Sequence, residues 1–189
     1  MADLESSAEL WIVRHGATTW SQTGRHTSHT EVPLDPLGEE QARALGKRLD
    51  EVSFSLVLSS PRLRARRTAE FAGFADPQID ADLAEWEYGD YEGITTSDIR
   101  AVDPEWTIFT GAVPGGETAE QVTARADRVI ERAAEGRTLV FTHGHLGRVL
   151  AARWLGLPAT DGRYFMLDTA TINVLGYERE QPVLLRWNA

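Results

Sequence analysis

Short hydrophobic runs alternate with longer amphipathic stretches along most of this chain. Residues 10–13, 54–58 and 139–141 are short apolar runs, interrupted only by Ser55, which are typical of strands buried on both faces. Residues 171–177 and 183–187 predict two paired strands near the C-terminus. The three internal runs are separated by segments with a helical period, so the pattern favours an α/β sheet.

Capping residues and apolar stripes mark the helices between these strands. Asp35 before Pro36 predicts a helix start, and Leu37, Ala44, Leu45 and Leu49 then share one stripe. Ser60-Pro61 opens a second helix that carries a group of arginines. Leu63, Phe71 and Phe74 are spaced so that they can share the inner face of that helix.

Three more helices follow, at residues 96–102, 117–134 and 146–155, with a Pro-Gly-Gly turn before the second. We therefore expect a three-layer α/β/α sandwich around a mostly parallel, mixed sheet. The chain shows neither repeats nor linkers, so we expect residues 1–189 to form one domain.

Composition narrows the classes of function. The 189 residues include no cysteine, which excludes disulfides, thiolate metal sites and a cysteine nucleophile. The net charge of −10 makes nucleic acid and anionic membranes poor partners. No apolar run approaches the ~18 residues of a membrane-spanning helix, and the acidic N-terminus does not resemble a signal peptide. We expect a cytoplasmic protein.

Histidines and arginines follow the three internal strands. Arg14-His15 ends the first strand, Ser60 and a run of arginines follow the second, and His143-Gly144-His145 follows the third. Ligands of such sheets bind beyond the carboxyl ends of the strands. The sequence therefore predicts that these side chains meet in one site.

Histidines and arginines at such a site are compatible with two chemistries, metal binding and anion binding. His143 and His145 could chelate a metal with His26 or His29, but no carboxylate cluster accompanies them and nearby arginines repel cations. Arginine matches phosphate oxygens, and a neutral imidazole is a competent nucleophile toward phosphorus. We therefore expect phosphoryl transfer without a metal or other cofactor.

Release of an alkoxide needs a general acid. Glu85 and Glu87 lie in a segment crowded with aromatic residues, and either carboxyl can fill this role on sequence grounds alone. The pair Asp80 and Asp82 imitates the paired aspartates of another phosphatase class. It lacks the expected residue at Ala84 and the apolar strand before it, so we interpret it as coincidental.

The ordered motifs resemble the histidine phosphatase superfamily, also called phosphoglycerate mutase-like. They cover most of the chain from about residue 10 to 150: Arg14-His15-Gly16, Ser60-Pro61-x-x-Arg64-Ala65-x-x-Thr68-Ala69, Leu83-x-Glu85, Gly89-x-x-Glu92-Gly93, Gly115-Gly116-Glu117 and His143-Gly144. The resemblance implies that His15 is the nucleophile and that Glu85, rather than Glu87, is the proton donor. It implies phosphate binding by Arg14, Arg64 and His143, and we expect Gly144 to contribute.

One loop departs from the family pattern. Relatives commonly carry an asparagine where this chain has Trp20-Ser21, and a Thr-Gly pair is here Thr27-Ser28. Ser21 and the backbone near Thr27 are expected to bind phosphate instead. This loop is similar to a branch containing sedoheptulose bisphosphatases and actinobacterial acid phosphatases.

The predicted function is therefore a phosphomonoesterase acting on a small phosphorylated metabolite, such as a sugar phosphate or sugar acid phosphate, through a phosphohistidine. Two alternatives remain: a phosphoglycerate mutase and a binding module that has lost catalysis. The short segment between Tyr91 and Gly115 favours the phosphatase, because mutases of the family carry a longer insertion there. The sequence assigns no oligomeric state. It also leaves open the roles of six residues: Arg62, Arg66, Arg67, His26, His29 and His145.

Overall fold

The central sheet of the computed structural model has six strands in the order β3-β2-β4-β1-β5-β6. The structure describes residues 8–189, so the acidic segment 1–7 lies outside the described residues. Four strands are parallel: β1 (Glu9–Arg14), β2 (Leu56–Ser59), β3 (Gln78–Ile79) and β4 (Arg137–Thr142). The C-terminal pair, β5 (Ile172–Glu178) and β6 (Gln181–Arg186), is antiparallel. The expected mixed, mostly parallel sheet is confirmed.

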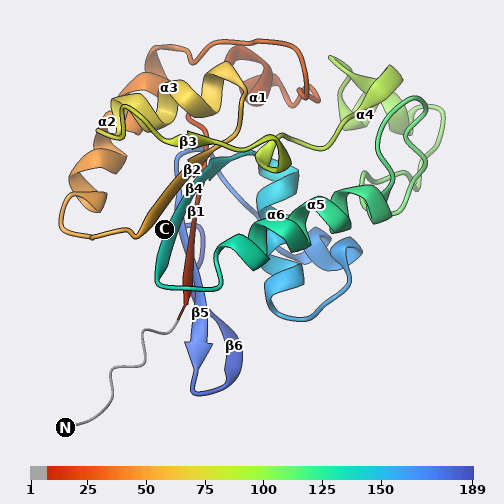
Figure 1. The fold of residues 1–189 in the computed structure, drawn as a ribbon. Coiled ribbons are helices and arrows are strands. Elements are labelled where there is room, and N and C mark those ends of the chain that lie inside the picture. Colours follow the sequence, from red (N-terminus) through yellow and green to blue (C-terminus); the bar gives the residue numbers. More distant parts are fainter. Residues whose placement is uncertain (1–7) are drawn as a thin grey trace, which may run out of the picture.

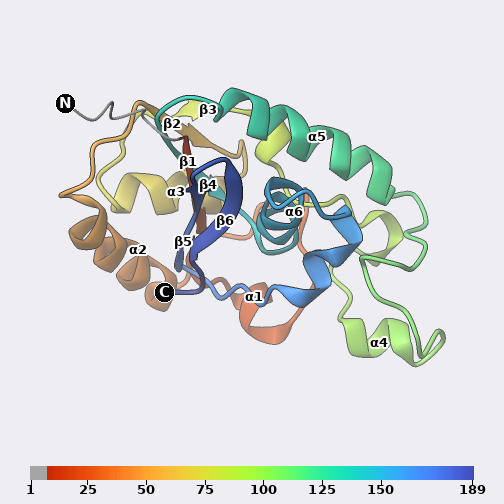
Figure 2. The same cartoon turned by 90° about the horizontal axis from the view of Figure 1, so that it is seen from below.

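Helices cover both faces of this sheet (Figures 1 and 2). On one face lie α2 (Pro36–Leu49) and α3 (Leu63–Phe71), and on the other lie α5 (Ala119–Arg132) and α6 (Gly144–Trp154). Successive strand residues alternate between two cores: Ile12 packs on the α6 side and Val13 on the α2 side. The predicted three-layer arrangement is thus confirmed.

The inner face of α3 differs from the prediction. Its buried residues are Arg64, Ala65, Thr68 and Ala69, whereas Leu63 and Phe71 are only partly buried and Phe74 lies beyond the helix end. Two alanines let the helix approach the sheet closely, and the side chain of Arg64 turns inward with them. The spacing of apolar residues did not predict this face, because one of its buried positions is an arginine, Arg64.

Several short elements were not predicted. These are α1 (Thr19–Thr23), strand β3, and the 3-10 turns Ala81–Leu83, Gly89–Tyr91 and Ala159–Tyr164. Helix α1 buries none of its residues, and a capping box between Thr18 and Ser21 defines its start. A five-residue helix without buried residues shows no hydrophobic periodicity from which the sequence could predict it. The short helix α4 (Thr96–Arg100) was expected and is present.

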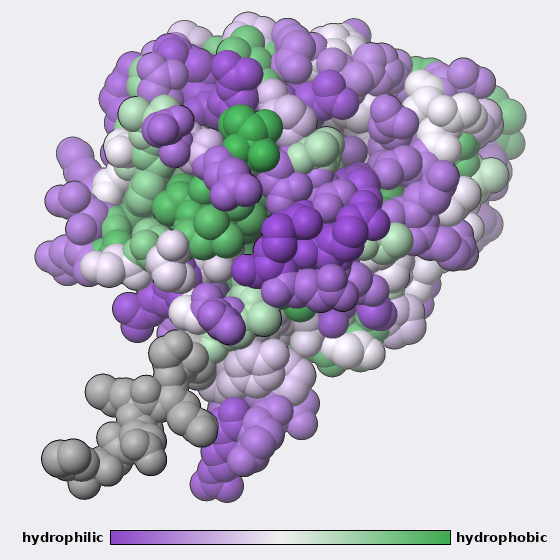
Figure 3. All heavy atoms as spheres, in the orientation of Figure 1, coloured by the Kyte–Doolittle hydropathy of each residue, from purple (hydrophilic) through white to green (hydrophobic). Residues whose placement is uncertain are grey.

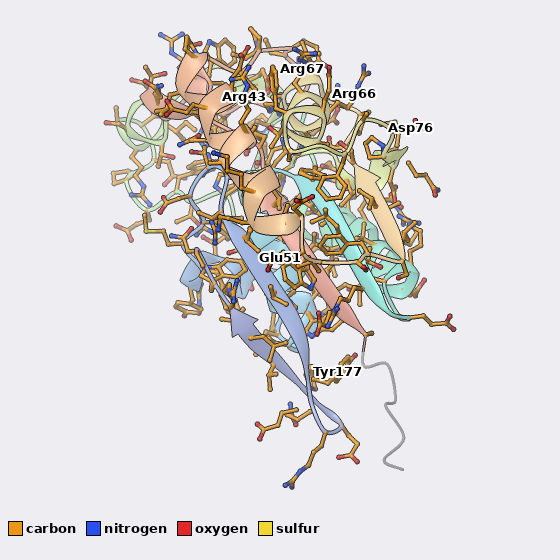
Figure 4. The ribbon with its side chains drawn as sticks, turned by 90° about the vertical axis from the view of Figure 1, so that its left-hand side faces the viewer. Arg43, Glu51, Arg66, Arg67, Asp76 and Tyr177 are labelled. Carbon is orange, nitrogen blue, oxygen red and sulfur yellow. The ribbon has the colours of Figure 1, made fainter. Side chains whose placement is uncertain are left out.

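Hydrophilic side chains cover much of the surface seen in Figure 3, but an apolar patch lies beside α2 and β2. In the same layer Trp11, Phe54, Val57 and Phe74 are only partly buried. Figure 4 shows the hairpin of β5 and β6, with Tyr177 on it, extending from the end of the sheet opposite α2 and α3. Among residues 8–189, no helix is long and apolar enough to cross a bilayer.

Candidate active site

His15 lies at the carboxyl end of β1, in the centre of the sheet. Its backbone N–H donates to the Thr142 carbonyl at 2.9 Å, and its side chain is only 5% exposed. The ring nitrogen Nδ1 lies 2.8 Å from the Gly16 carbonyl, to which it donates. This contact fixes the tautomer, so Nε2 carries the lone pair. Burial and the positive charges of Arg64 and Arg14 hold the pKa of His15 well below 6.5.

The backbone after His15 is held by an unusually close approach to α2. A Cβ atom on Gly16 would lie 2.4 Å from the Gly38 carbonyl oxygen, and one on Gly38 would lie 2.1 Å from the Ala17 oxygen. Only glycine fits at both positions. The Gly16 N–H also donates to Thr68 Oγ1 at 3.0 Å, which ties the loop to α3.

His143 lies at the end of β4, directly before α6, and is fully buried. Its Nε2 lies 2.7 Å from Ser60 Oγ, which accepts the Arg62 backbone N–H at 3.3 Å. If the Ser60 hydroxyl donates to Nε2, the ring proton of His143 lies on Nδ1. The His143 and His15 rings lie edge to face with centroids 5.3 Å apart. Burial, with Arg64 next, holds the pKa of His143 well below 6.5.

Two guanidinium groups lie beside these rings. Arg14 Nη1 donates to the Leu167 carbonyl at 2.5 Å. Arg64 is fully buried and donates through Nη1 and Nη2 to the carbonyls of Thr30, Thr27 and Ser28, at 2.9–3.2 Å. Burial lowers the pKa of each arginine below its ordinary value, and the charge of Glu85 partly opposes this. Both groups remain cationic because an arginine pKa starts so high.

The loop that supplies those carbonyls is fixed by Glu92. Its carboxylate accepts the backbone N–H groups of Ser28 and Thr30 at 2.9–3.0 Å and the Ser28 hydroxyl at 2.5 Å. Burial alone would raise the pKa of Glu92, but these hydrogen bonds outweigh it and lower the pKa. Glu92 thus orients the loop, and the loop orients Arg64.

Glu85 faces the same space from the opposite side and is 6% exposed. Its carboxylate accepts the backbone N–H groups of Trp86, His145 and Leu146 at 2.9–3.0 Å, so it lies against the first turn of α6. Glu87 is exposed to solvent. The structure therefore brings Glu85, and not Glu87, to the strand ends.

A cavity of about 190 Å³ opens between these groups. Six of the residues predicted for the site line it: Arg14, His15, Ser21, Thr27, Glu85 and Gly144. The other two, Arg64 and His143, are fully buried next to the cavity, and the His143 ring lies 5.3 Å from the His15 ring. A Cβ on Gly144 would lie 3.4 Å from the Arg14 guanidinium, so a larger side chain there would crowd this arginine. Ser21 Oγ also bonds to Thr18 at the start of α1.

The rest of the cavity wall was not among the predicted site residues, although the sequence had raised His26 and His145 as possible chelators. These wall residues are Gly24, Arg25, His26, Tyr88, Thr96, His145, Arg148 and Leu167. The Tyr88 hydroxyl lies 2.6 Å from His145 Nδ1, and the His26 ring lies 4.7 Å from the Tyr88 ring. Burial raises the pKa of Tyr88 well above 10 and lowers the pKa of His26 and His145. Arg148 could have been found, since it follows Gly144 by one turn of α6.

Other candidates lie outside the cavity. Figure 4 shows Arg66 and Arg67 on the outer side of α3, where Arg67 pairs with Glu70 at 2.6 Å. His29 is exposed, with Nδ1 4.0 Å from Glu92. Asp80 and Asp82 form ion pairs with arginines of α5, and hydrogen bonding from Arg128 lowers the pKa of Asp82 to about 2. These two aspartates join α5 to the sheet rather than forming a site.

No group of three or more potential ligand side chains within residues 8–189 is placed to hold a metal ion. The donor set around His15 consists instead of two guanidinium groups, two imidazoles and one carboxylate. Such a set matches an oxyanion better than a cation.

A family comparison agrees with this geometry. Residues 10–189 match the model of the histidine phosphatase superfamily (branch 1), and the chain belongs to that family. It is 42% identical over 175 residues to an acid phosphatase of Mycobacterium tuberculosis, covering 89% of this chain and 86% of that one. It is 39% identical over 181 residues to sedoheptulose 1,7-bisphosphatase of Saccharomyces cerevisiae, covering 77% and 67%. A solved structure of a Mycobacterium tuberculosis open reading frame superposes with a TM-score of 0.91 at 39% identity, covering 95% and 96%.

Proposed function

We propose that this protein is a metal-independent phosphatase that hydrolyses small sugar phosphates or related organic phosphates through a phosphohistidine. Among its relatives, one is named an acid phosphatase and one a sugar bisphosphatase. The cavity of about 190 Å³ suits a small metabolite, because pockets for larger ligands measure ~300–1,000 Å³.

One observation carries this proposal: three buried polar atoms beside His15 lack a partner in the described part of the chain. They are Arg14 Nε, Arg64 Nε and His143 Nδ1. An unsatisfied buried donor costs about 1–3 kcal/mol, so such atoms are rare without a reason. A tetrahedral phosphoryl group beside His15 Nε2 would accept from all three, and it would be held by two positive charges.

The reaction then has two steps. In the first, His15 Nε2 attacks phosphorus, the N–P bond forms and the ester P–O bond breaks. The electron pair of the broken P–O bond goes to the leaving oxygen, which takes a proton from Glu85. In the second, water attacks phosphorus, Glu85 takes a proton from that water, and the N–P bond breaks to release inorganic phosphate. The arginines and His143 stabilise the transferred group in both steps.

A direct test is hydrolysis of p-nitrophenyl phosphate and glucose 6-phosphate in EDTA, with detection of phosphohistidine from phosphorus-labelled substrate after a denaturing quench at alkaline pH. We expect turnover of both and a labelled protein that loses its label on treatment with acid. Loss of activity in EDTA, restored by a divalent cation, would contradict the metal-free mechanism. Return of the phosphoryl group to a sugar-acid hydroxyl would identify a mutase, and binding without turnover would identify a silent module.

We also propose that residues 1–189 act as one domain, since β1 near the N-terminus lies between β4 and β5. The absence of cysteine is compatible with the reducing cytoplasm as its location. The arginines of the cavity support a small anionic substrate as the partner, whereas the net charge of −10 argues against nucleic acid.

A further inference from the structure

Tyr88 and His145 form a hydrogen-bonded pair beside Glu85, and neither residue has a role in the two reaction steps above. The Tyr88 hydroxyl lies 2.6 Å from His145 Nδ1, and Tyr88 is 2% exposed. All three side chains line the cavity at His15. His145 lies on the first turn of α6 (Figure 1), and its backbone N–H donates to Glu85 Oε2 at 3.0 Å. His145 therefore contacts Glu85 through its backbone and Tyr88 through its ring.

The two carboxylate oxygens of Glu85 differ in the hydrogen bonds that they accept. Oε1 accepts the backbone N–H groups of Trp86 and Leu146, both at 2.9 Å, and these two bonds use both of its lone pairs. Oε2 accepts one backbone N–H, that of His145. One lone pair of Oε2 is left, so the proton that Glu85 gives to the leaving oxygen is carried there.

The Tyr88 hydroxyl competes for this last lone pair. Burial, followed by the charge of Glu85 and hydrogen bonding to its carboxylate, raises the pKa of Tyr88 well above its ordinary value, so the hydroxyl keeps its proton. A phenol has one proton and donates it to one acceptor. If Tyr88 donates to Glu85 Oε2, the position of the acid proton is occupied. If it donates to His145 Nδ1, that position stays free.

The state of the His145 ring decides between these two arrangements. Nδ1 accepts a hydrogen bond only when the ring is neutral and its proton lies on Nε2. Burial, with Arg148 next, holds the pKa of His145 well below its ordinary value, so the ring is neutral. The short contact with Tyr88 then places the phenol proton between the Tyr88 oxygen and Nδ1, directed away from Glu85.

We propose that His145 is a positioning residue for the general acid: its Nδ1 accepts the Tyr88 proton and so keeps the last lone pair of Glu85 Oε2 for the proton that the leaving oxygen receives. This proposal rests on the phosphatase function proposed above. Loss of the acceptor would turn the Tyr88 hydroxyl toward Glu85 and hold that carboxylate as an acceptor. Phosphorylation of His15 would then slow for leaving groups that need a proton, and not for p-nitrophenolate.

The dependence on the leaving group tests this, because a purely structural contact would affect all substrates alike. We would measure kcat/KM, which reports the phosphorylation step, for glucose 6-phosphate and p-nitrophenyl phosphate. His145→Leu should lower the ratio of the first value to the second by at least about tenfold. His145→Asn, whose side-chain oxygen takes the place of Nδ1, should restore most of the ratio. Tyr88→Phe added to His145→Leu should restore it too, because the competing hydroxyl is then gone.

His29→Leu and Tyr91→Phe are the matched controls and should leave the ratio unchanged, because neither side chain is part of the cavity wall. A wild-type ratio in His145→Leu, or a double variant as impaired as His145→Leu, would overturn the proposal and leave the phosphatase function intact. If neither substrate is turned over, the phosphatase function fails, and nitrogen NMR of the His145 ring still tests the hydrogen-bond arrangement. A ring proton on Nε2 supports the arrangement, and one on Nδ1 overturns it.

Discussion

The residues around His15 and the residues lining the rest of the cavity are positioned in different ways. The inner centre, defined as Arg14, His15, Arg64 and His143, lies on strand ends and on the buried face of α3. The outer wall, defined as Ser21, Arg25, Thr27, Thr96 and Arg148, comes from loops, short helices and one helix turn. The centre is tied to the core of the fold, whereas the wall can vary without disturbing the sheet. We infer that the centre performs the chemistry and the wall selects the substrate.

The largest effect is expected for the nucleophile. His15→Ala should lower kcat by at least about 1,000-fold, because it removes the imidazole that forms the phosphoenzyme. Steady-state kinetics with circular dichroism would show the loss in a folded protein. His29→Ala, at an exposed position outside the cavity, should retain wild-type activity. Near-normal activity of His15→Ala would show that the inner centre is not the site of chemistry.

The general acid comes next. Glu85→Gln should slow hydrolysis of a sugar phosphate by about 10²–10⁴-fold, since an alkoxide needs a proton to leave. The phosphorylation step with p-nitrophenyl phosphate should slow much less, because p-nitrophenolate leaves unaided. Dephosphorylation also uses Glu85, so a burst of p-nitrophenol is expected in this variant. Glu87→Gln is the matched control. An equal loss for both substrates without a burst would remove Glu85 from this role.

Replacement of Arg64, the buried arginine beside His15, should lower kcat/KM somewhat less. Arg64→Lys keeps the charge but loses the planar fork, and we expect a loss of about 2–4 kcal/mol of transition-state stabilisation, roughly 30- to 1,000-fold in kcat/KM. Arg66→Lys, two residues away on the outer side of α3, should change nothing measurable. A thermal melt of both variants separates this loss from unfolding. Similar activity of the two variants would contradict phosphate binding by Arg64.

Titration of His15 tests the electrostatics of the centre. Burial, Arg64 and Arg14 lower its pKa, so the ring stays neutral and nucleophilic as pH falls below 6.5. Arg14→Met removes one positive charge and should raise the pKa of His15 toward its ordinary value. NMR titration of the His15 ring would measure its pKa in the wild type and in the Arg14→Met variant. Arg132→Met, in an ion pair with Asp80, is the control and should leave the titration unchanged.

The smallest change is expected at the outer wall. Ser21→Ala should alter kcat/KM by less than about fivefold, because Ser21 Oγ is already bonded to Thr18 and offers phosphate only a neutral contact. The change should appear in KM rather than in kcat. A large loss of kcat in Ser21→Ala would place this side chain in the chemical centre and erase the distinction between the two regions.

The difference between the inner centre and the outer wall also explains which site residues the sequence could predict. Strand-end residues such as His15 and His143 follow directly from the apolar runs, because the carboxyl ends of parallel strands meet at one edge. The choice of Glu85 over Glu87 needed the family resemblance, since spacing alone does not say which carboxyl faces inward. The roles of Tyr88 and His145 depend on tertiary contacts between distant segments, which no local pattern encodes.

The four buried histidines of the site have a consequence for survival in acid. His15, His26, His143 and His145 all have a lowered pKa in the folded protein, so they bind fewer protons than the unfolded chain just below pH 6.5. Each then removes about 1.4 kcal/mol of folding free energy per pH unit, until pH reaches its own folded-state pKa. Falling pH is therefore expected to lower the free energy of unfolding while the nucleophile of each folded molecule is still neutral, which thermal melts at a series of pH values would measure.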